Sequence, residues 1–192
     1  MASKFFELLN KYYKTSTEFN AQAERARKWF RDAAQKIHVD NTKSLTSRDT
    51  GMTQRHRLKP QTGLRVANIG RVVLFHYDAK TKEKLPYWDA FPCAIPIRVQ
   101  RNRFWALNLH YLPPTLRAKL LDGLYAHYKN EHLDERKRLQ LDYELLKKTE
   151  RLRYFKPCIK QYLVSHVRSS MNVVDPKEWD FVVMLPTERF QK

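Results

Sequence analysis

Segment 71–114 is rich in aromatic residues and has arginines among them, a mixture typical of surfaces that bind nucleic acid. Guanidinium groups bind phosphate oxygens, and exposed aromatic rings stack on unpaired bases. A strand that only fills a core needs apolar residues at every second position, and this segment holds more aromatic and basic residues than that pattern requires. The candidate phosphate ligands here are Arg98, Arg101 and Arg103, and the candidate stacking platforms are Trp88 and Trp105.

Two further groups of cations extend this prediction. Segment 43–71 contains seven Lys and Arg residues and a single acid, Asp49, so we interpret it as a basic loop or arm. The candidate phosphate ligands in this arm are Arg55, Arg57, Lys59 and Arg65. A second group lies near the C-terminus and consists of Lys156, Lys160 and Arg168. For each group the alternative is a solvated surface, and for the aromatic residues it is a place in the hydrophobic core.

The sequence lacks the spacings of common catalytic and metal sites. The seven histidines are scattered without an HExxH pattern, no cysteine pair has zinc-ligand spacing, and no glycine-rich phosphate loop is present. Three acid-x-Lys triplets, at Asp78, Glu135 and Asp175, are about as many as chance supplies. We therefore predict a protein that is not an enzyme and has no cofactor and no metal. The alternative is a metal-dependent nuclease, in which Asp78 and Asp89 would approach each other and bind a cation.

Composition and charge define the class of partner. The chain has 192 residues, 42% of them apolar, and a net charge of +17, so the charge is carried on a folded protein. Such a surplus attracts a polyanion, which leaves nucleic acid, an anionic membrane surface or an acidic protein. The longest apolar run, 181–185, is far too short to span a membrane, and the first residues lack the apolar region of a secretory signal. We expect Cys93 and Cys158 to be reduced and buried.

Hydrophobic periodicity predicts an α+β fold. Apolar residues at spacings of three and four predict helices over 19–37, 114–129, 134–148 and 157–169. Strand patterns cover 71–77, 93–99, 104–111 and 179–185, and Pro96 places the second strand at an edge or a bulge. We expect a small antiparallel sheet of about four strands packed with three to four helices. Residues 1–70 would form an N-terminal helix and basic arm, and residues 71–192 the α+β core.

Several long motifs, in order, resemble one protein family. They include YDAKTK at 77–82, LPYWDAFP at 85–92, LNLHYLPP at 107–114, FKPCIKQYL at 155–163, SHV at 165–167, EWD at 178–180 and LPTERF at 185–190, after ARKWFR at 26–31. Over roughly residues 24–192 the chain resembles the head-completion, or DNA end protector, proteins of T-even-type tailed bacteriophages and their marine relatives.

The resemblance implies a non-enzymatic virion protein that is made in the host cytoplasm. Such a protein would bind the double-stranded ends of the packaged genome at the vertex through which DNA leaves the head, and would shield them from exonuclease. Its other partners would be virion proteins of the portal, neck or tail, with no membrane involved.

An alternative function stays open at this point. The chain could be a structural component of the neck, tail or baseplate, whose basic and aromatic residues mediate protein–protein contacts. Protein interfaces favour Tyr, Trp and Arg because these side chains combine a large contact area with a polar group. Composition therefore does not separate this alternative from DNA binding.

Overall fold

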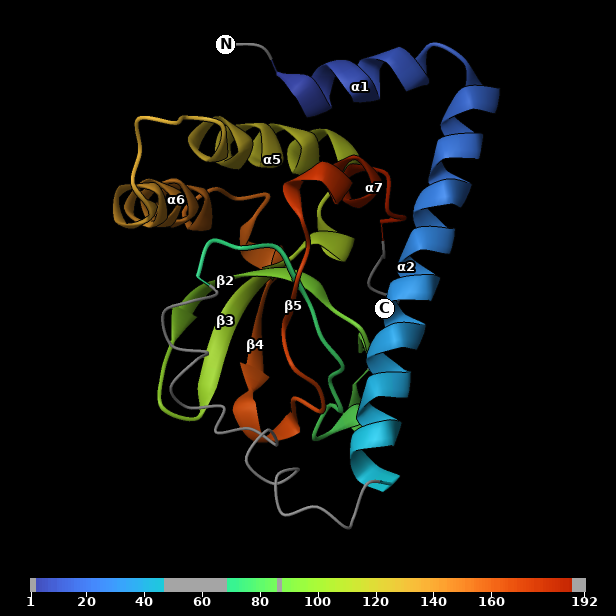
Figure 1. Cartoon of the computed structure of the whole chain (residues 1–192), viewed down its shortest axis with the longest axis vertical. Helices are drawn as coiled ribbons and strands as arrows, with labels where there is room; N and C mark the ends of the chain where they lie inside the picture. Colours follow the sequence, from blue (N-terminus) through green and yellow to red (C-terminus); the bar gives the residue numbers. More distant parts are fainter. Residues whose placement is uncertain (1–2, 47–68, 86–87, 188–192) are drawn as a thin grey trace.

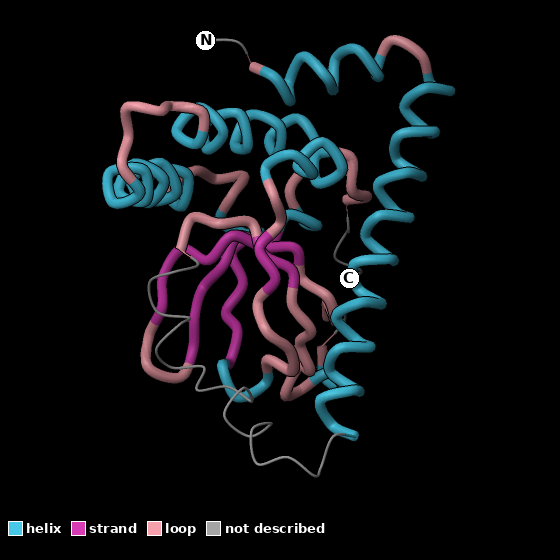
Figure 2. The backbone as a smooth tube through the Cα atoms, viewed as in Figure 1, coloured by secondary structure: helices cyan, strands magenta, loops and turns pink. Residues whose placement is uncertain are grey.

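The computed structural model describes residues 3–46, 69–85 and 88–187, with side chains given except at 40–46. The candidate ligands Arg55, Arg57, Lys59 and Arg65 lie outside the described residues. Helices and one antiparallel sheet make up the described part, which confirms the predicted α+β class. Four of the helices gather at one end of the sheet, while the long helix α2 runs beside it (Figure 1 and Figure 2).

The sheet has five strands in the order β4-β3-β2-β1-β5. Their bounds are β1 Val73–Leu74, β2 Cys93–Val99, β3 Arg103–Asn108, β4 Ile159–Leu163 and β5 Asn172–Val173. The first three form the expected meander, although β1 is shorter than the predicted 71–77 and β3 ends before a 3-10 turn, Leu109–Tyr111. The bulge expected from Pro96 is present, because the β2–β3 register shifts between Pro96 and Arg98.

The described helices are α1 Lys4–Tyr13, α2 Ser16–Thr46, α5 Pro114–Tyr128, α6 Glu135–Glu150 and α7 Trp179–Val183. Helix α5 begins at a proline, and α6 begins after Asp134, whose carboxylate accepts a hydrogen bond from the Lys137 amide (2.7 Å). Proline at the first turn and aspartate at the N-cap both favour a helix start. The predictions for 114–129 and 134–148 are thus confirmed to within two residues.

Helix α2 packs along the domain through the apolar face that its sequence predicts. Ala23, Ala26 and Ile37 are buried on this face, and Phe30 meets the ring of His110 edge-on with centroids 4.9 Å apart. The Trp29 indole donates a hydrogen bond to Glu178 (3.0 Å), just before α7. Contacts at several positions along α2, from Ala23 to Ile37, therefore hold this helix against the α+β domain.

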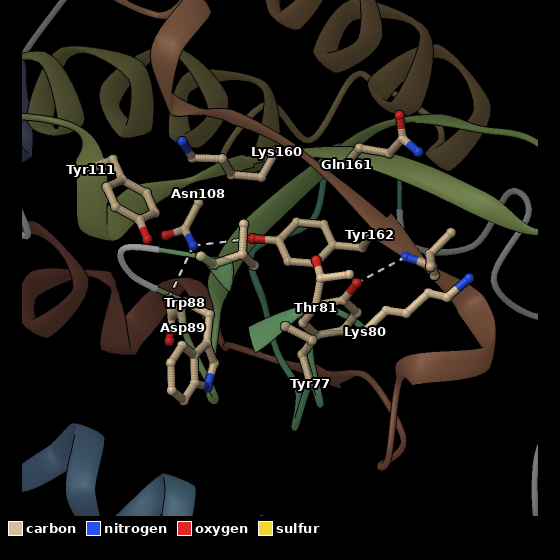
Figure 3. Close-up of a pocket in the computed structure, with 13 residues that line it drawn as sticks. Tyr77, Lys80, Thr81, Trp88, Asp89, Asn108, Tyr111, Lys160, Gln161 and Tyr162 are labelled. Carbon is tan, nitrogen blue, oxygen red and sulfur yellow. Dashed lines mark hydrogen bonds between the residues drawn. The ribbon is translucent and has the colours of Figure 1, made fainter. Parts of the chain in front are cut away.

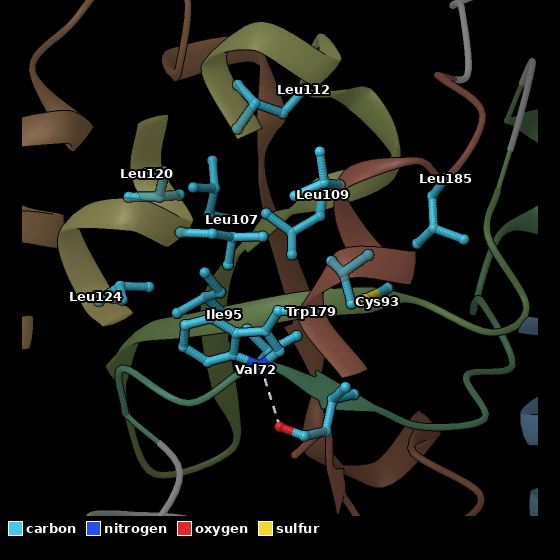
Figure 4. Close-up of a cluster of buried hydrophobic side chains, with 14 of the residues drawn as sticks. Val72, Cys93, Ile95, Leu107, Leu109, Leu112, Leu120, Leu124, Trp179 and Leu185 are labelled. Carbon is cyan, nitrogen blue, oxygen red and sulfur yellow. Dashed lines mark hydrogen bonds between the residues drawn. The ribbon is translucent and has the colours of Figure 1, made fainter. Parts of the chain in front are cut away.

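One core fills the space between the sheet and the helices. Cys93, Ile95 and Leu107 of the sheet, and Val72 just before β1, meet apolar residues of α5 and the buried indole of Trp179 (Figure 4). Cys93 and Cys158 are buried free thiols, as expected. A smaller cluster, which includes Phe75, Phe104 and Tyr162, fills the opposite side of the sheet. The sheet is thus covered on both faces.

The prediction of a strand over 179–185 is wrong. Residues 179–183 form helix α7, and Trp179, Val182 and Val183 are buried at helical spacing. A short continuous apolar run is compatible with a strand or with a buried helix, so its periodicity does not distinguish the two. Buried Arg117 of α5 favours the helix, because its guanidinium donates hydrogen bonds to the carbonyls of Val182, Val183 and Leu185 (2.6–3.0 Å). These contacts satisfy carbonyls that a helix C-terminus leaves without intrahelical partners.

The prediction of a helix over 157–169 is also wrong. Ile159, Leu163 and Val167 lie four residues apart, yet this segment forms strand β4, with short 3-10 turns at Lys156–Cys158 and Val164–His166. Strand β4 pairs with β3 from Arg103 to Leu107, so backbone hydrogen bonds between strands replace those of a helix. This long-range pairing outweighs the local pattern.

Candidate nucleic-acid interface

The predicted ligands occupy two separate surfaces of the sheet. Arg98, Arg101, Arg103 and Trp105 form the tip of the β2–β3 hairpin, which we call the hairpin surface. Trp88 and Lys160 instead line a cavity of about 450 Å³ beside strand β4, which we call the aromatic pocket. Directly opposed residues share a face, so Trp105 points with Gln161 to one side of β3, while Ala106 and Lys160 point to the other.

On the hairpin surface, an arginine lies over a tryptophan. The Arg98 guanidinium carbon is 4.2 Å from the centre of the Trp105 ring, and that of Arg103 is 5.8 Å away. The bulge creates this pair, because it sets Arg98 opposite Trp105 where a regular ladder continuing from Pro96–Ala106 would set it opposite Phe104. Arg98 also approaches Glu150 at the end of α6 (4.0 Å), and Arg101 is exposed in the turn. The surface thus presents three exposed arginines, two of which lie near a half-buried indole.

The aromatic pocket combines four aromatic rings with two lysines. Tyr77, Trp88, Tyr111 and Tyr162 line it, together with Lys80 and Lys160 (Figure 3). The Trp88 side chain is 43% exposed, so a large apolar ring borders an open cavity. Lys160 lies with its ammonium 4.5 Å from the centre of the Tyr111 ring, and burial lowers the pKa of this lysine. Rings and cations together are the elements of a site for a stacked, negatively charged ligand.

A buried polar network supports the pocket. The carboxylate of Asp89, only 9% exposed, lies 2.8 Å from Nδ1 of His110 and accepts hydrogen bonds from the Asn108 amide (3.0 Å) and the Phe91 backbone (3.0 Å). Burial disfavours the charged form of Asp89, but attraction to His110 and the three hydrogen bonds outweigh it, so the pKa of Asp89 lies below its ordinary value. The network joins the motifs at 85–92 and 107–114, and it fixes the backbone next to Trp88.

The pocket wall formed by Tyr162 is equally fixed. The Asn108 amide donates a second hydrogen bond to the Tyr162 hydroxyl (3.1 Å), and burial raises the pKa of that tyrosine well above its ordinary value. The Tyr77 hydroxyl accepts a hydrogen bond from the Leu163 amide of the edge strand (3.2 Å). These bonds occupy polar groups that would otherwise face a ligand. The hydroxyls of Tyr77 and Tyr162 are therefore held in place, and their rings form fixed walls of the pocket.

The remaining candidates lie apart from both surfaces or already have ionic partners. Lys156 is exposed in the 3-10 turn before β4. Arg168 donates to Asp78 (3.2 Å), which also accepts from Lys82 (3.2 Å), and these hydrogen bonds, with Lys82 the larger contributor, lower the pKa of Asp78. Asp78 and Asp89 thus interact with different partners. Within the described ranges no group of three or more metal-ligating side chains occurs.

Sequence reasoning missed the residues that support the pocket. Asn108 and His110 were not singled out, Asp89 was considered only as a cation ligand together with Asp78, and Lys80 entered only as the last residue of the acid-x-Lys triplet that begins at Asp78. A usable signal exists, because Asn108 stands between Leu107 and Leu109 in an apolar strand, and a buried polar side chain needs hydrogen-bond partners. Which partners it finds depends on the long-range packing of the two motifs.

Comparison with known proteins shows the family. The family described as phage T4 terminal DNA protecting protein matches residues 3–192, which is nearly the whole chain, and the protein belongs to this family. It is thus a bacteriophage DNA end protector. Searches of curated proteins and of solved structures gave no match. The helices that the structure describes include none long and apolar enough to cross a membrane.

Proposed function

We propose that this protein binds the ends of the packaged phage genome directly and without catalysis, and shields them from exonuclease at the vertex through which DNA leaves the head. The observation that carries the proposal is the hairpin surface, where the guanidinium groups of Arg98 and Arg103 lie near the indole of Trp105 and Arg101 is exposed in the adjoining turn. Guanidinium groups neutralise phosphates, and an aromatic ring at the same place offers a stacking surface for a terminal base pair.

The excess charge of the chain supports the same proposal. A net charge of +17 draws DNA to the protein at long range and makes the affinity fall steeply with salt. We assign phosphate contacts to Arg98, Arg101 and Arg103 of the hairpin surface. Further phosphate contacts are proposed for Arg55, Arg57, Lys59, Arg65, Lys156, Lys160 and Arg168, with Trp88 and Trp105 as stacking residues.

Non-enzymatic protection is consistent with the buried acid beside the pocket. The Asp89 carboxylate is held by His110, Asn108 and the Phe91 amide. Because the lone pairs of this carboxylate accept hydrogen bonds from protein groups, we assign it a structural role and not a catalytic one. Protection then follows from occupying the DNA end, so that an exonuclease cannot load there.

A binding comparison tests the proposal. Blunt linear DNA and a closed circle of equal length and sequence are titrated with the protein at two salt concentrations, and the linear form is also challenged with a double-strand exonuclease. We expect tighter binding to the linear form and protection that saturates at a fixed number of proteins per end. Equal affinity for both forms, with unprotected ends, would contradict the proposal.

The alternative, a structural component of the neck, tail or baseplate, has one observation in its favour. Leu152 and Tyr154, in the turn after α6, are 52% and 70% exposed and alternate with two exposed arginines. Apolar side chains with a cationic rim are typical of protein contacts. Under this alternative Leu152→Ser and Tyr154→Ser would prevent incorporation into virions and leave DNA binding in solution unchanged.

A further inference from the structure

We propose that the aromatic pocket holds one unpaired nucleotide at the end of a DNA strand. This inference rests on the proposed function and assigns a second, distinct site within it. The hairpin surface would bind the duplex, and the pocket would capture a terminal nucleotide that has left its pair.

The size of the pocket selects a single nucleotide. Small-ligand pockets measure about 300–1,000 Å³, and the cavity of about 450 Å³ lies near the lower end of this range. A DNA duplex is too wide for a pocket of this size, because its major groove alone, which is only part of the duplex, is about 12 Å wide. Taking a nucleotide out of the stack costs a few kcal/mol within a duplex and least where the base is already unpaired. A strand end is therefore the place where the pocket is filled most readily.

The rings of the pocket suit a base. Trp88 and Tyr111 border the cavity from two different motifs, and Trp88 remains 43% exposed. Stacking of one base on an aromatic side chain contributes about 1–3 kcal/mol. Because Asp89 is bound to His110 next to Trp88, the adjoining backbone is held before the ligand arrives. A site that is already ordered loses less conformational entropy on binding.

Two lysines suit the phosphate. Lys80 and Lys160 both line the pocket, and Figure 3 shows them on different sides of it, with Tyr111 beside Lys160. A nucleotide that stacks on the rings would therefore have a cation near the phosphate that joins it to the rest of the strand. The Asp89 carboxylate, which also lines the pocket, is bound to His110 and Asn108. Both lysines place positive charge at the wall of the pocket, which favours a negatively charged ligand.

The pocket should accept every base. Several polar groups on its walls are already hydrogen-bonded within the protein: the Asn108 amide donates to Asp89 and Tyr162, and the Tyr77 hydroxyl accepts from the Leu163 amide. Stacking on the rings is therefore expected to contribute more than reading of a base edge. Stacking is tolerant of sequence because each base has an aromatic face. We therefore expect capture of a strand end regardless of its terminal base.

A fluorescent base tests the pocket separately from end binding. 2-Aminopurine is placed as a single unpaired nucleotide at the end of a linear duplex and, in a control duplex, at an internal paired position. Stacking on Trp88 should quench the terminal probe on addition of protein and leave the internal probe unchanged. The Trp88→Ala variant should lose the quenching and bind the overhang duplex about tenfold more weakly, whereas Trp88→Phe should retain most of both.

Matched variants and competitors separate the possible outcomes. Trp105→Ala, on the hairpin surface, should keep the terminal quenching of the overhang duplex while weakening the binding of blunt linear DNA. Circular dichroism and thermal unfolding verify that each variant is folded. A terminal probe that stays bright in the wild-type complex, while linear DNA still outcompetes circular DNA, overturns the pocket proposal and leaves the proposed function standing. Equal binding of linear and circular DNA defeats the proposed function itself.

A free 2′-deoxynucleoside 5′-monophosphate is the probe in the last part of the experiment. Suppose that it quenches the part of the protein fluorescence that Trp88→Ala removes, at micromolar concentration, and leaves the affinity for DNA ends unchanged. The pocket then binds a free nucleotide, and the strand-end assignment is wrong. If it competes with the overhang duplex only at millimolar concentration, the strand-end assignment is supported, because the duplex contacts then supply the rest of the affinity.

Discussion

The hairpin surface and the aromatic pocket use the same residue types in different ways. On the hairpin surface the tryptophan is covered by Arg98, and the neighbouring arginines are exposed. In the pocket the tryptophan borders an open cavity, and a network of buried hydrogen bonds holds the backbone beside it. Exposed cations on a hairpin favour the general attraction of a polyanion, whereas a preformed cavity favours recognition of one chemical feature. The contrast predicts that the hairpin surface supplies most of the affinity for DNA and that the pocket adds to the preference for ends.

Disrupting the network of the pocket should have the largest effect. Asp89→Ala leaves the buried polar groups of Asn108 and His110 without their shared partner. We expect the free energy of unfolding to fall by about 3 kcal/mol, as for other broken buried pairs. Chemical denaturation measures this loss. Lys28→Ala, an exposed change on α2, should leave stability within about 0.5 kcal/mol of wild type.

Removing the hairpin cations should weaken binding to all DNA. The triple variant Arg98→Ala, Arg101→Ala and Arg103→Ala should lower the affinity for linear and circular DNA by about 100-fold at low salt. The slope of log affinity against log salt should fall by about 3, or about one for each phosphate that is no longer neutralised. Fluorescence anisotropy at several salt concentrations measures both quantities. A triple variant that loses only its preference for ends would reverse the roles assigned to the two surfaces.

Acid should destabilise the fold through the buried Asp89 carboxylate beside the pocket. The pKa of Asp89 in the folded protein lies below its ordinary value of 3.8, so its charged form stabilises the fold. This contribution is complete at neutral pH and is lost as the pH falls below about 4 and through the lowered pKa. Thermal unfolding across pH 2–7 should show the loss, and Asp89→Asn should remove that part of the pH dependence. An unchanged acid limb in the variant would mean that other carboxylates account for it.

Replacing Arg98 by lysine should have the smallest effect. The substitution keeps the charge but removes the flat guanidinium that lies over Trp105. We expect DNA affinity to fall about threefold with an unchanged salt slope, together with a change in Trp105 fluorescence. The same change at Arg103, whose guanidinium is farther from the ring, should have less effect on the fluorescence. Equal responses at both positions would show that the stacking geometry has no role in binding.

Local sequence signals predicted the elements whose pattern and caps agree. Helices α5 and α6 carry apolar stripes and favourable first residues, and α2 buries the face that its spacing indicates. The errors lie where a tertiary contact decides between two states. Residues 159–163 pair with β3 to become a strand, and residues 179–183 become a helix whose end is held by Arg117.

The candidate site was predictable in kind but not in arrangement. Arginine and tryptophan in one segment indicated a surface for phosphates and bases, yet the chain separates Trp88 from Trp105. The separation depends on the register of β3 and on the bulge after Pro96, which no local pattern fixes. The Asp89–His110 contact joins residues 21 positions apart, so it also follows from folding and not from spacing. Whether these surfaces touch DNA remains a prediction.

Photocrosslinking tests the central claim most directly. A linear duplex carrying a photoreactive base at its last position, and a second duplex carrying it far from the ends, are irradiated with the protein and the crosslinked peptides are identified. Direct end binding predicts that the terminal probe attaches to peptides containing Trp88, Tyr111 or the 98–105 hairpin, with little crosslinking from the internal probe. Equal crosslinking from both positions, or attachment of the terminal probe only elsewhere on the protein, would contradict it.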